Sequence, residues 1–118
     1  MSFEIRTIDV FDRQAKRMAK RYASFRDDYA ELLKELKDNP FAGSDLGGGI
    51  RKVRMAIASK GKGKSGGARV ITYTADVIIH TRNGELVLLS VYDKSDQSTI
   101  SDKEIKRLRA LATQTIEE

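Results

Sequence analysis

The sequence contains no cysteine and a single histidine, His80, among its 118 residues. Without cysteine the chain has no disulfide, no thiolate zinc site and no cysteine nucleophile, which is typical of proteins of the reducing cytosol. His80 stands beside a predicted turn, far in sequence from the basic residues described below, so we expect it to have a structural or solvent-facing role. Clusters of histidine and carboxylates at metal-ligand spacing are also lacking, and we expect neither a metal nor a cofactor.

Long apolar runs are lacking as well. No stretch approaches the roughly 20 apolar residues that span a bilayer, and the first residues, Met1–Arg6, do not form the apolar core of a signal peptide. These features predict a cytoplasmic protein with no membrane segment. The chain length suits one domain with one hydrophobic core, which we expect to cover residues 1–118.

The charge of the sequence is unevenly distributed along the chain. Its net charge is +5 and its pI is about 9.6. Residues 1–49 carry nine basic and nine acidic side chains, and residues 70–118 carry six basic and eight acidic ones. Residues 50–69 hold seven basic residues and no acid. Such a segregated positive field attracts polyanions and speeds encounter with them. A lysine-rich surface loop with no ligand is the less favoured alternative.

The hydrophobic periodicity predicts two helices after a short N-terminal strand at residues 3–8. The first helix begins near Asp9 and places apolar side chains at helical spacing: Phe11, Ala15, Met18 and Tyr22. The second begins at Ser24, with acidic residues in its first turn, and ends at Asn39-Pro40. Two amphipathic helices so close in sequence form an antiparallel pair that must cover an apolar surface.

Three strands and a last helix are predicted after a glycine-rich loop. Residues 50–58 alternate, residues 68–80 are rich in β-branched and aromatic side chains, and residues 86–92 form an apolar run typical of a buried strand. Asn83-Gly84 predicts a two-residue hairpin turn, and Ser101 with Glu104 predicts a capping box. The predicted fold class is therefore α+β. An antiparallel-rich sheet has an N-terminal helical pair on one face and an open opposite face, and a C-terminal helix follows.

The most basic stretch runs from Lys60 to Arg69. Its lysines Lys60, Lys62 and Lys64 alternate with glycines, so the backbone can bend closely around an anion that several ammonium groups reach. A nucleotide P-loop is not indicated, because Ala58 stands where that loop needs a glycine and a strand pattern follows where it needs a helix.

Further cations stand on the neighbouring predicted strands. Alternation places Lys52 and Arg54 on one face, about 6–7 Å apart, and Arg69 opens the next strand, so the three can form a fixed cationic platform. Tyr92 ends the buried strand. Its side chain either stacks on a nucleic-acid base or takes part in proton transfer, or it is a core residue whose hydroxyl lies at the rim. Asp93 can pair with a nearby cation and orient it.

Three blocks of the sequence resemble the RelE/ParE superfamily of bacterial toxins, closest to its HigB-like branch. The blocks are Leu46–Arg54, Lys60–Tyr73 and Leu88–Lys94, in this order after a helical pair. The resemblance implies the toxin of a type II toxin–antitoxin system, namely an endoribonuclease (mRNA interferase) that cleaves mRNA in the ribosomal A site and inhibits translation without a metal. It also implies a cognate antitoxin, often a helix-turn-helix protein.

The resemblance also implies roles for individual residues. Lys52, Arg54 and Arg69 match positions where the family keeps phosphate-binding and catalytic cations, and Lys94 lies near a further basic position. Tyr92 is the nearest match, at a shifted position, to a tyrosine or histidine that some members use in catalysis.

Cleavage next to a 2′-hydroxyl suits this set of residues. We expect Arg54 and Arg69 to stabilise the phosphate, Lys52 to transfer a proton, and Tyr92 to stack on a base or handle a proton. The loop lysines are expected to bind the backbones of rRNA and mRNA: Lys60, Lys62 and Lys64.

Two other functions share part of this pattern. A ParE-like inhibitor of DNA gyrase needs no catalytic geometry, but it has less use for such concentrated phosphate-binding charge. A non-catalytic RNA-binding module is the second alternative. Aromatic residues make up 7% of the chain and few lie near the basic stretch, whereas such modules display aromatic stacking platforms.

Overall fold

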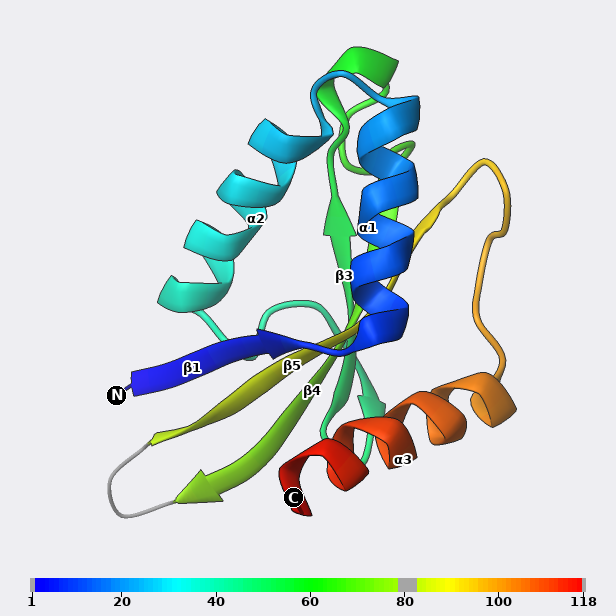
Figure 1. The fold of residues 1–118 in the computed structure, drawn as a ribbon. Coiled ribbons are helices and arrows are strands. Elements are labelled where there is room, and N and C mark those ends of the chain that lie inside the picture. The colour runs from blue at the N-terminus through cyan, green and yellow to red at the C-terminus, as the bar shows by residue number, and fades with distance from the viewer. Residues whose placement is uncertain (1, 79–82, 118) are drawn as a thin grey trace.

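The computed structural model describes residues 2–78 and 83–117, and it forms an α+β fold (Figure 1). The elements in chain order are β1 (Ser2–Thr7), α1 (Asp9–Arg21), α2 (Phe25–Asp38), β2 (Ser44–Gly47), β3 (Ile50–Met55), the 3₁₀ turn η1 (Ala58–Lys60), β4 (Ala68–Ile78), β5 (Asn83–Asp93) and α3 (Asp102–Glu117). The N-terminal helical pair, the sheet and the C-terminal helix confirm the predicted class. His80 lies outside the described residues.

The five strands make one sheet in the order β1-β5-β4-β3-β2. β1 runs parallel to β5, and the other pairs are antiparallel. Ser101 accepts a hydrogen bond from Glu104 N at 3.1 Å, as predicted for the start of the last helix. The side chain of Glu104 pairs with Arg107 instead of returning to Ser101, so half of the predicted capping box forms.

Two local predictions were wrong because strand pairing overrides the preference of a short segment for a turn or loop. Asn83 and Gly84 are not a hairpin turn: they open β5, where they pair with Ser2 and Phe3 of β1. The predicted loop before residue 50 contains β2, whose Ser44 pairs with Lys52 of β3. Each of these segments therefore gains a partner that the local sequence does not reveal.

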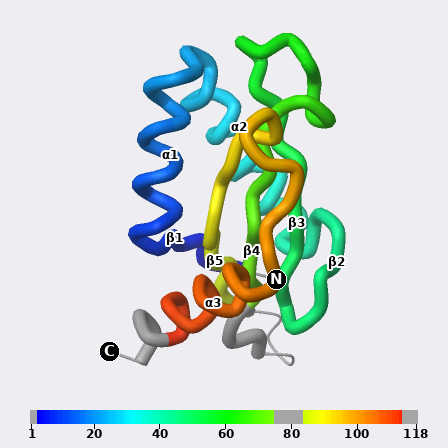
Figure 2. The backbone as a smooth tube through the Cα atoms, turned by 90° about the vertical axis from the view of Figure 1, so that its right-hand side faces the viewer, coloured from blue at the N-terminus to red at the C-terminus, as the bar shows by residue number. Residues whose placement is uncertain are grey.

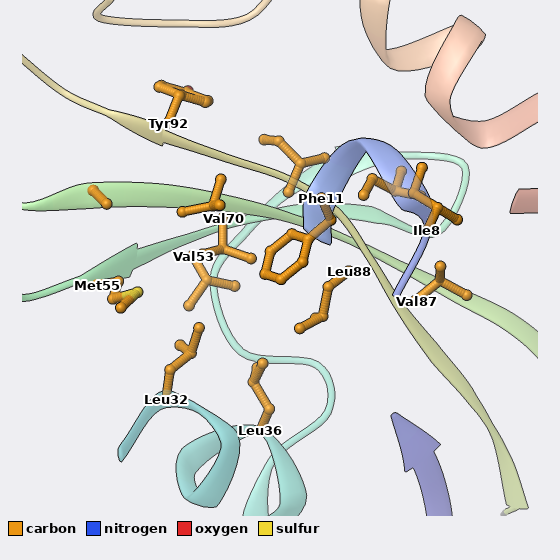
Figure 3. Packing of buried hydrophobic residues seen from close by; sticks show 14 of the residues in the cluster. Ile8, Phe11, Leu32, Leu36, Val53, Met55, Val70, Val87, Leu88 and Tyr92 are labelled. Carbon is orange, nitrogen blue, oxygen red and sulfur yellow. The ribbon is translucent and has the colours of Figure 1, made fainter. Parts of the chain in front are cut away.

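The helical pair packs its apolar side chains on one face of the sheet. α1 and α2 run in opposite directions and diverge (Figure 1). Leu32 and Leu36 of α2 point toward Val53 and Met55 of β3 (Figure 3), and all four are buried. Fully burying one such side chain contributes about 1.5–3 kcal/mol, so this layer holds the sheet in place.

The opposite face is less open than predicted. Residues 94–101, which connect β5 to α3, cross this face, so the sheet lies between them and α2 (Figures 1 and 2). Ile71 on this side is fully buried, and so are Leu108 and Ala112 of α3. No helix within residues 2–78 and 83–117 has the length and apolar character needed to cross a membrane.

Candidate functional site

The residues predicted to act on RNA come together on one face of the sheet. Arg54 in β3 lies directly opposite Arg69 in β4, and Arg69 lies directly opposite Tyr92 in β5. Directly opposed residues in a sheet share a face and have Cα atoms about 4.5–5.5 Å apart. Lys52 precedes Arg54 by two residues and so shares its face, about 6–7 Å along the strand. The three strands thus place four predicted site residues in one patch.

This patch lies on the face opposite the helical layer. Val53 and Met55 alternate with the cations of β3 and point toward α2 (Figure 3). Alternation therefore places Lys52, half-buried, and Arg54, exposed, on the opposite face. Arg54 also lines a hollow at the edge of β3 together with Asp28, Glu31 and Glu35 of α2. The prediction that Lys52, Arg54 and Arg69 share a face is confirmed by this register.

Arg69 is 5% exposed, and its guanidinium holds the basic loop in shape. Nη1 donates to the carbonyl oxygens of Lys64 and Ala68, both at 3.0 Å, and Nη2 donates to that of Ser65 at 3.1 Å. These acceptors are uncharged, and no carboxylate pairs with Arg69 in the part of the chain that the structure describes. Arg69 is therefore buried without a carboxylate partner among the described residues.

Lys60 is buried in an ion pair. Its Nζ lies 2.7 Å from Asp93 Oδ1 and 2.9 Å from Ser95 Oγ, and its side chain is 6% exposed. Tyr22, the residue that follows α1, donates its hydroxyl hydrogen to Asp93 Oδ2. The prediction that Asp93 pairs with a cation is confirmed, and the pair joins the start of the basic loop to the end of β5.

The environment of Asp93 favours its charged form. Burial alone would raise the pKa of this carboxyl, but hydrogen bonds from Lys60, Tyr22 and the backbone N–H of Ser95 outweigh it and hold the pKa well below its usual range. The hydrogen bond from Tyr22 to Asp93, together with burial, raises the pKa of the Tyr22 hydroxyl. Asp93 thus stays ionised as the counter-charge of Lys60.

The other predicted cations are exposed, and one of them reaches the helical layer. Lys62 is exposed, and Lys64 pairs with Glu35 at 3.3 Å with its side chain still 56% exposed. A surface pair of this kind stabilises by about 0–1 kcal/mol, so a phosphate can displace it. Lys94 is also exposed, and its N–H donates to Gly67 O at 3.1 Å, which places it at the base of the loop.

Tyr92 is 6% exposed, and its hydroxyl has no hydrogen-bond partner among the residues described. Burial raises the pKa of this hydroxyl, and the nearby positive charge of Arg69 partly opposes the rise. Contact of the hydroxyl with RNA therefore requires a displacement of the chain that covers it.

Gly67 lets the basic loop approach β3 closely. A Cβ atom at this position would lie 2.1 Å from Met55 O and 3.0 Å from Ile57 N, both backbone atoms. We expect Gly67→Ala to lower the free energy of unfolding by about 1–3 kcal/mol, as overpacked sites do. Urea unfolding followed by circular dichroism measures this change.

Gly61→Asn is the matched control for this prediction. Gly61 has φ +71°, which asparagine tolerates, and no atom lies within 4 Å of its would-be Cβ. We expect a change below about 1 kcal/mol. Equal losses in the two variants would show that loop conformation, and not the contact with Met55, decides the cost.

Two features of the site were missed in the sequence. The helical stripe predicts Tyr22 as a core residue, because nothing in the spacing shows that its hydroxyl reaches a carboxylate 71 residues away. The cations of α1 were also missed, because counting charge over residues 1–49 balanced them with acids elsewhere in that range. A shorter counting window would have found the second feature.

Among the described residues, no group of three or more histidine, cysteine or acidic side chains could hold a metal ion.

The sequence matches the family model of the RelE toxin of the RelE / RelB toxin-antitoxin system over residues 9–118. The matched range includes every residue of the patch and of the Lys60–Asp93 ion pair.

Proposed function

The chain belongs to the RelE toxin family, and we propose that this toxin is an endoribonuclease that cuts mRNA on the ribosome and so inhibits translation. The observation that carries the proposal is the direct alignment of Arg54, Arg69 and Tyr92 across β3, β4 and β5. Such an alignment concentrates phosphate-binding groups where an RNA strand can lie across the sheet. A toxin of this family has an antitoxin as its partner, which we infer to be of the helix-turn-helix type.

The cleavage step is an attack by the 2′-oxygen on the adjacent phosphorus. The 2′-hydroxyl loses its proton, a pentavalent phosphorane forms, and the bond to the 5′-oxygen breaks as that oxygen gains a proton. The products are a 2′,3′-cyclic phosphate and a free 5′-hydroxyl. The step needs cations that bind the phosphorane more strongly than the ground state.

The arginines supply that stabilisation. Arg54 is exposed and can hold two phosphate oxygens with its planar guanidinium. Three of the five N–H groups of Arg69 donate to carbonyl oxygens. Two N–H groups therefore remain for a phosphate oxygen, and the bound carbonyls fix their direction in advance.

We assign the proton transfers to Lys52 and Tyr92, which flank the arginines on the same face; Tyr92 acts once the chain that covers its hydroxyl is displaced. We assign to Lys94 a contact with the nucleotide that carries the leaving 5′-oxygen. Each general acid–base step contributes about 10²–10⁴-fold. Lys62 and Lys64 bind the RNA backbone from the loop. Lys60 is committed to Asp93, so we assign it to holding the loop in position instead of contacting RNA directly.

We place the toxin in the cytoplasm with its ribosomal target and nearest the HigB-like branch, on the strength of the three sequence blocks. Primer extension on an mRNA under translation, with and without ribosomes, tests the activity. We expect cuts within the coding region that require ribosomes. Growth arrest with intact mRNA and trapped gyrase–DNA complexes would instead support a ParE-like inhibitor, and RNA binding with no cleavage would leave a binding module.

A further inference from the structure

A hollow of about 350 Å³ lies beside the carboxyl end of β5. β1 pairs with β5 as far as Leu88, so residues 89–93 have no strand on that side in the part of the chain that the structure describes. α1 lies on one side of this end of β5, and the segment after β5 lies on the other (Figure 2). Pockets that hold small ligands have volumes of about 300–1,000 Å³, so the hollow has room for a group the size of a nucleobase.

Gln14 of α1 lines this hollow and is held in place by β5. Its Oε1 accepts hydrogen bonds from Val91 N at 3.0 Å and from Ser90 Oγ at 3.1 Å. A backbone N–H can only donate, so the oxygen of the amide must be the atom that faces Val91. Among the described residues no acceptor bonds to Gln14 Nε2. Gln14 therefore presents two free N–H donors from a side chain whose position is fixed.

Acceptors stand on the segment that follows β5. Gln97 donates from its Nε2 to Thr99 O at 2.9 Å, which leaves its Oε1 free to accept. Asp96 adds carboxylate oxygens, one of which pairs with Arg21 at 2.8 Å. Gln97 and Asp96 line the hollow together with Gln14, so one ligand can meet donors and acceptors there. Nucleobases carry donors and acceptors side by side on the edges by which proteins recognise them.

The rest of the lining suits a flat base that is joined to a phosphate. Met18 and Val91, both buried, supply an apolar surface. Arg17 and Arg21, both exposed, make the α1 side of the hollow positive. Tyr92 also lines the hollow, and its hydroxyl is buried without a hydrogen-bond partner among the residues described. A ligand that displaces the chain covering this hydroxyl would give it a partner.

The hollow adjoins the patch that holds the phosphate. Tyr92 lies directly opposite Arg69, and adjacent strands of a sheet are about 4.8 Å apart. A nucleotide whose phosphate is held at Arg69 can therefore place its base in the hollow. Proteins commonly recognise single-stranded RNA through bases that leave the stack and form hydrogen bonds along their edges.

We propose that the hollow receives an unstacked mRNA base next to the phosphate that is cut, and that Gln14 selects this base through its two free N–H groups. The inference rests on the proposed function, because mRNA is the substrate of that function. A base that turns an acceptor toward Gln14 Nε2 is bound. A base that turns a donor toward it is rejected, because both groups then lose their hydrogen bonds to water without gaining a partner.

Gln14→Glu tests this role. The glutamate can still accept from Val91 N and Ser90 Oγ, but its second oxygen accepts where Nε2 donated. Guanine carries two neighbouring donors on its Watson–Crick edge, so the variant should favour guanine. Cuts are mapped by primer extension on a translated mRNA that presents each base beside its cut sites. The ratio of cutting at guanine to cutting at the other bases is expected to rise by about fivefold or more, as for one base-edge contact.

Lys20→Gln is the matched control, because it changes the net charge by the same amount on the same helix but lies outside the hollow. Its base preference is expected to stay within about twofold of wild type, because an exposed charge outside the hollow is screened. Both variants are also compared in binding to short RNA oligonucleotides that differ in one base. These carry hydrogen in place of the reactive 2′-hydroxyl, so they bind without being cut. Thermal unfolding confirms that each variant folds.

A wild-type base preference in Gln14→Glu, in cutting and in binding, would overturn the inference. An equal change in Lys20→Gln would overturn it as well. A loss of antitoxin affinity with an unchanged base preference would overturn it and assign the hollow to the antitoxin. The oligonucleotide measurements need no cleavage. A shifted binding preference in a toxin whose wild type makes no cuts would therefore support the pocket while refuting the proposed nuclease activity.

Discussion

Ribosome-dependent mRNA cleavage is expected to fall by about 10²–10³-fold when Arg69 is replaced by alanine, the size of effect seen when one preorganised donor to a developing anion is removed. Arg69 is expected to act in two ways. Its guanidinium supplies positive charge to the patch, and its bonds to Lys64, Ala68 and Ser65 fix the loop that carries the exposed lysines. Primer extension on a translated mRNA, with the rate taken from a time course, measures the loss.

Two further variants show whether the loss belongs to the guanidinium. Arg69→Lys keeps the charge but has three N–H donors instead of five and no planar fork, so it cannot hold the three carbonyl oxygens and a phosphate at once. Its activity is expected to lie between those of wild type and Arg69→Ala. Arg51→Ala removes an arginine of β3 that contacts Phe41 and Thr74 instead of the patch, and it should retain activity within about threefold. If Arg69→Ala is folded and cleaves like wild type, Arg69 has no part in the reaction.

Asp93→Ala is expected to lower the free energy of unfolding by about 3–5 kcal/mol, the cost of removing one partner of a buried ion pair. The Asp93 side chain is fully buried, and its loss leaves the ammonium group of Lys60, 6% exposed, without a counter-charge. The hydroxyl of Tyr22 loses its acceptor at the same time. Chemical unfolding followed by circular dichroism gives the free energy of each variant.

Asp96→Ala is the matched control, because Asp96 is an exposed carboxylate that pairs with Arg21 at 2.8 Å. Surface pairs contribute about 0–1 kcal/mol, so this variant should unfold nearly as wild type does. Equal costs for the two aspartates would contradict the assignment of Asp93 as the buried counter-charge.

The contribution of Asp93 should also depend on pH. Because its pKa is lower in the folded protein than in the unfolded chain, its ionisation contributes full stability above the unfolded pKa of about 3.9. The contribution declines as the pH falls below that value toward the folded pKa. The gap in unfolding free energy between wild type and Asp93→Asn should therefore narrow below about pH 4. A gap that stays constant down to pH 2.5 would contradict this linkage.

The shared face of the patch cations was predictable because strand geometry is local. Side chains two residues apart on a strand share a face, so Lys52 and Arg54 could be placed together before the structure was known. The pairing of Arg54 with Arg69 could also be expected, since two strands joined by one loop commonly pair as neighbours. The loop lysines were identified together, yet the structure separates them into buried Lys60 and exposed Lys62 and Lys64.

The sequence by itself determined the α+β class, the helices, the common face of Lys52 and Arg54 and the charged loop, because periodicity and local charge follow from neighbouring residues. The tertiary structure alone decided that Lys60 is buried in an ion pair with Asp93, that Tyr22 completes their network, and that residues 94–101 cross the face of the sheet opposite α2. Burial and ion pairing depend on which distant segments meet across the sheet. Spacing along the chain does not contain that information.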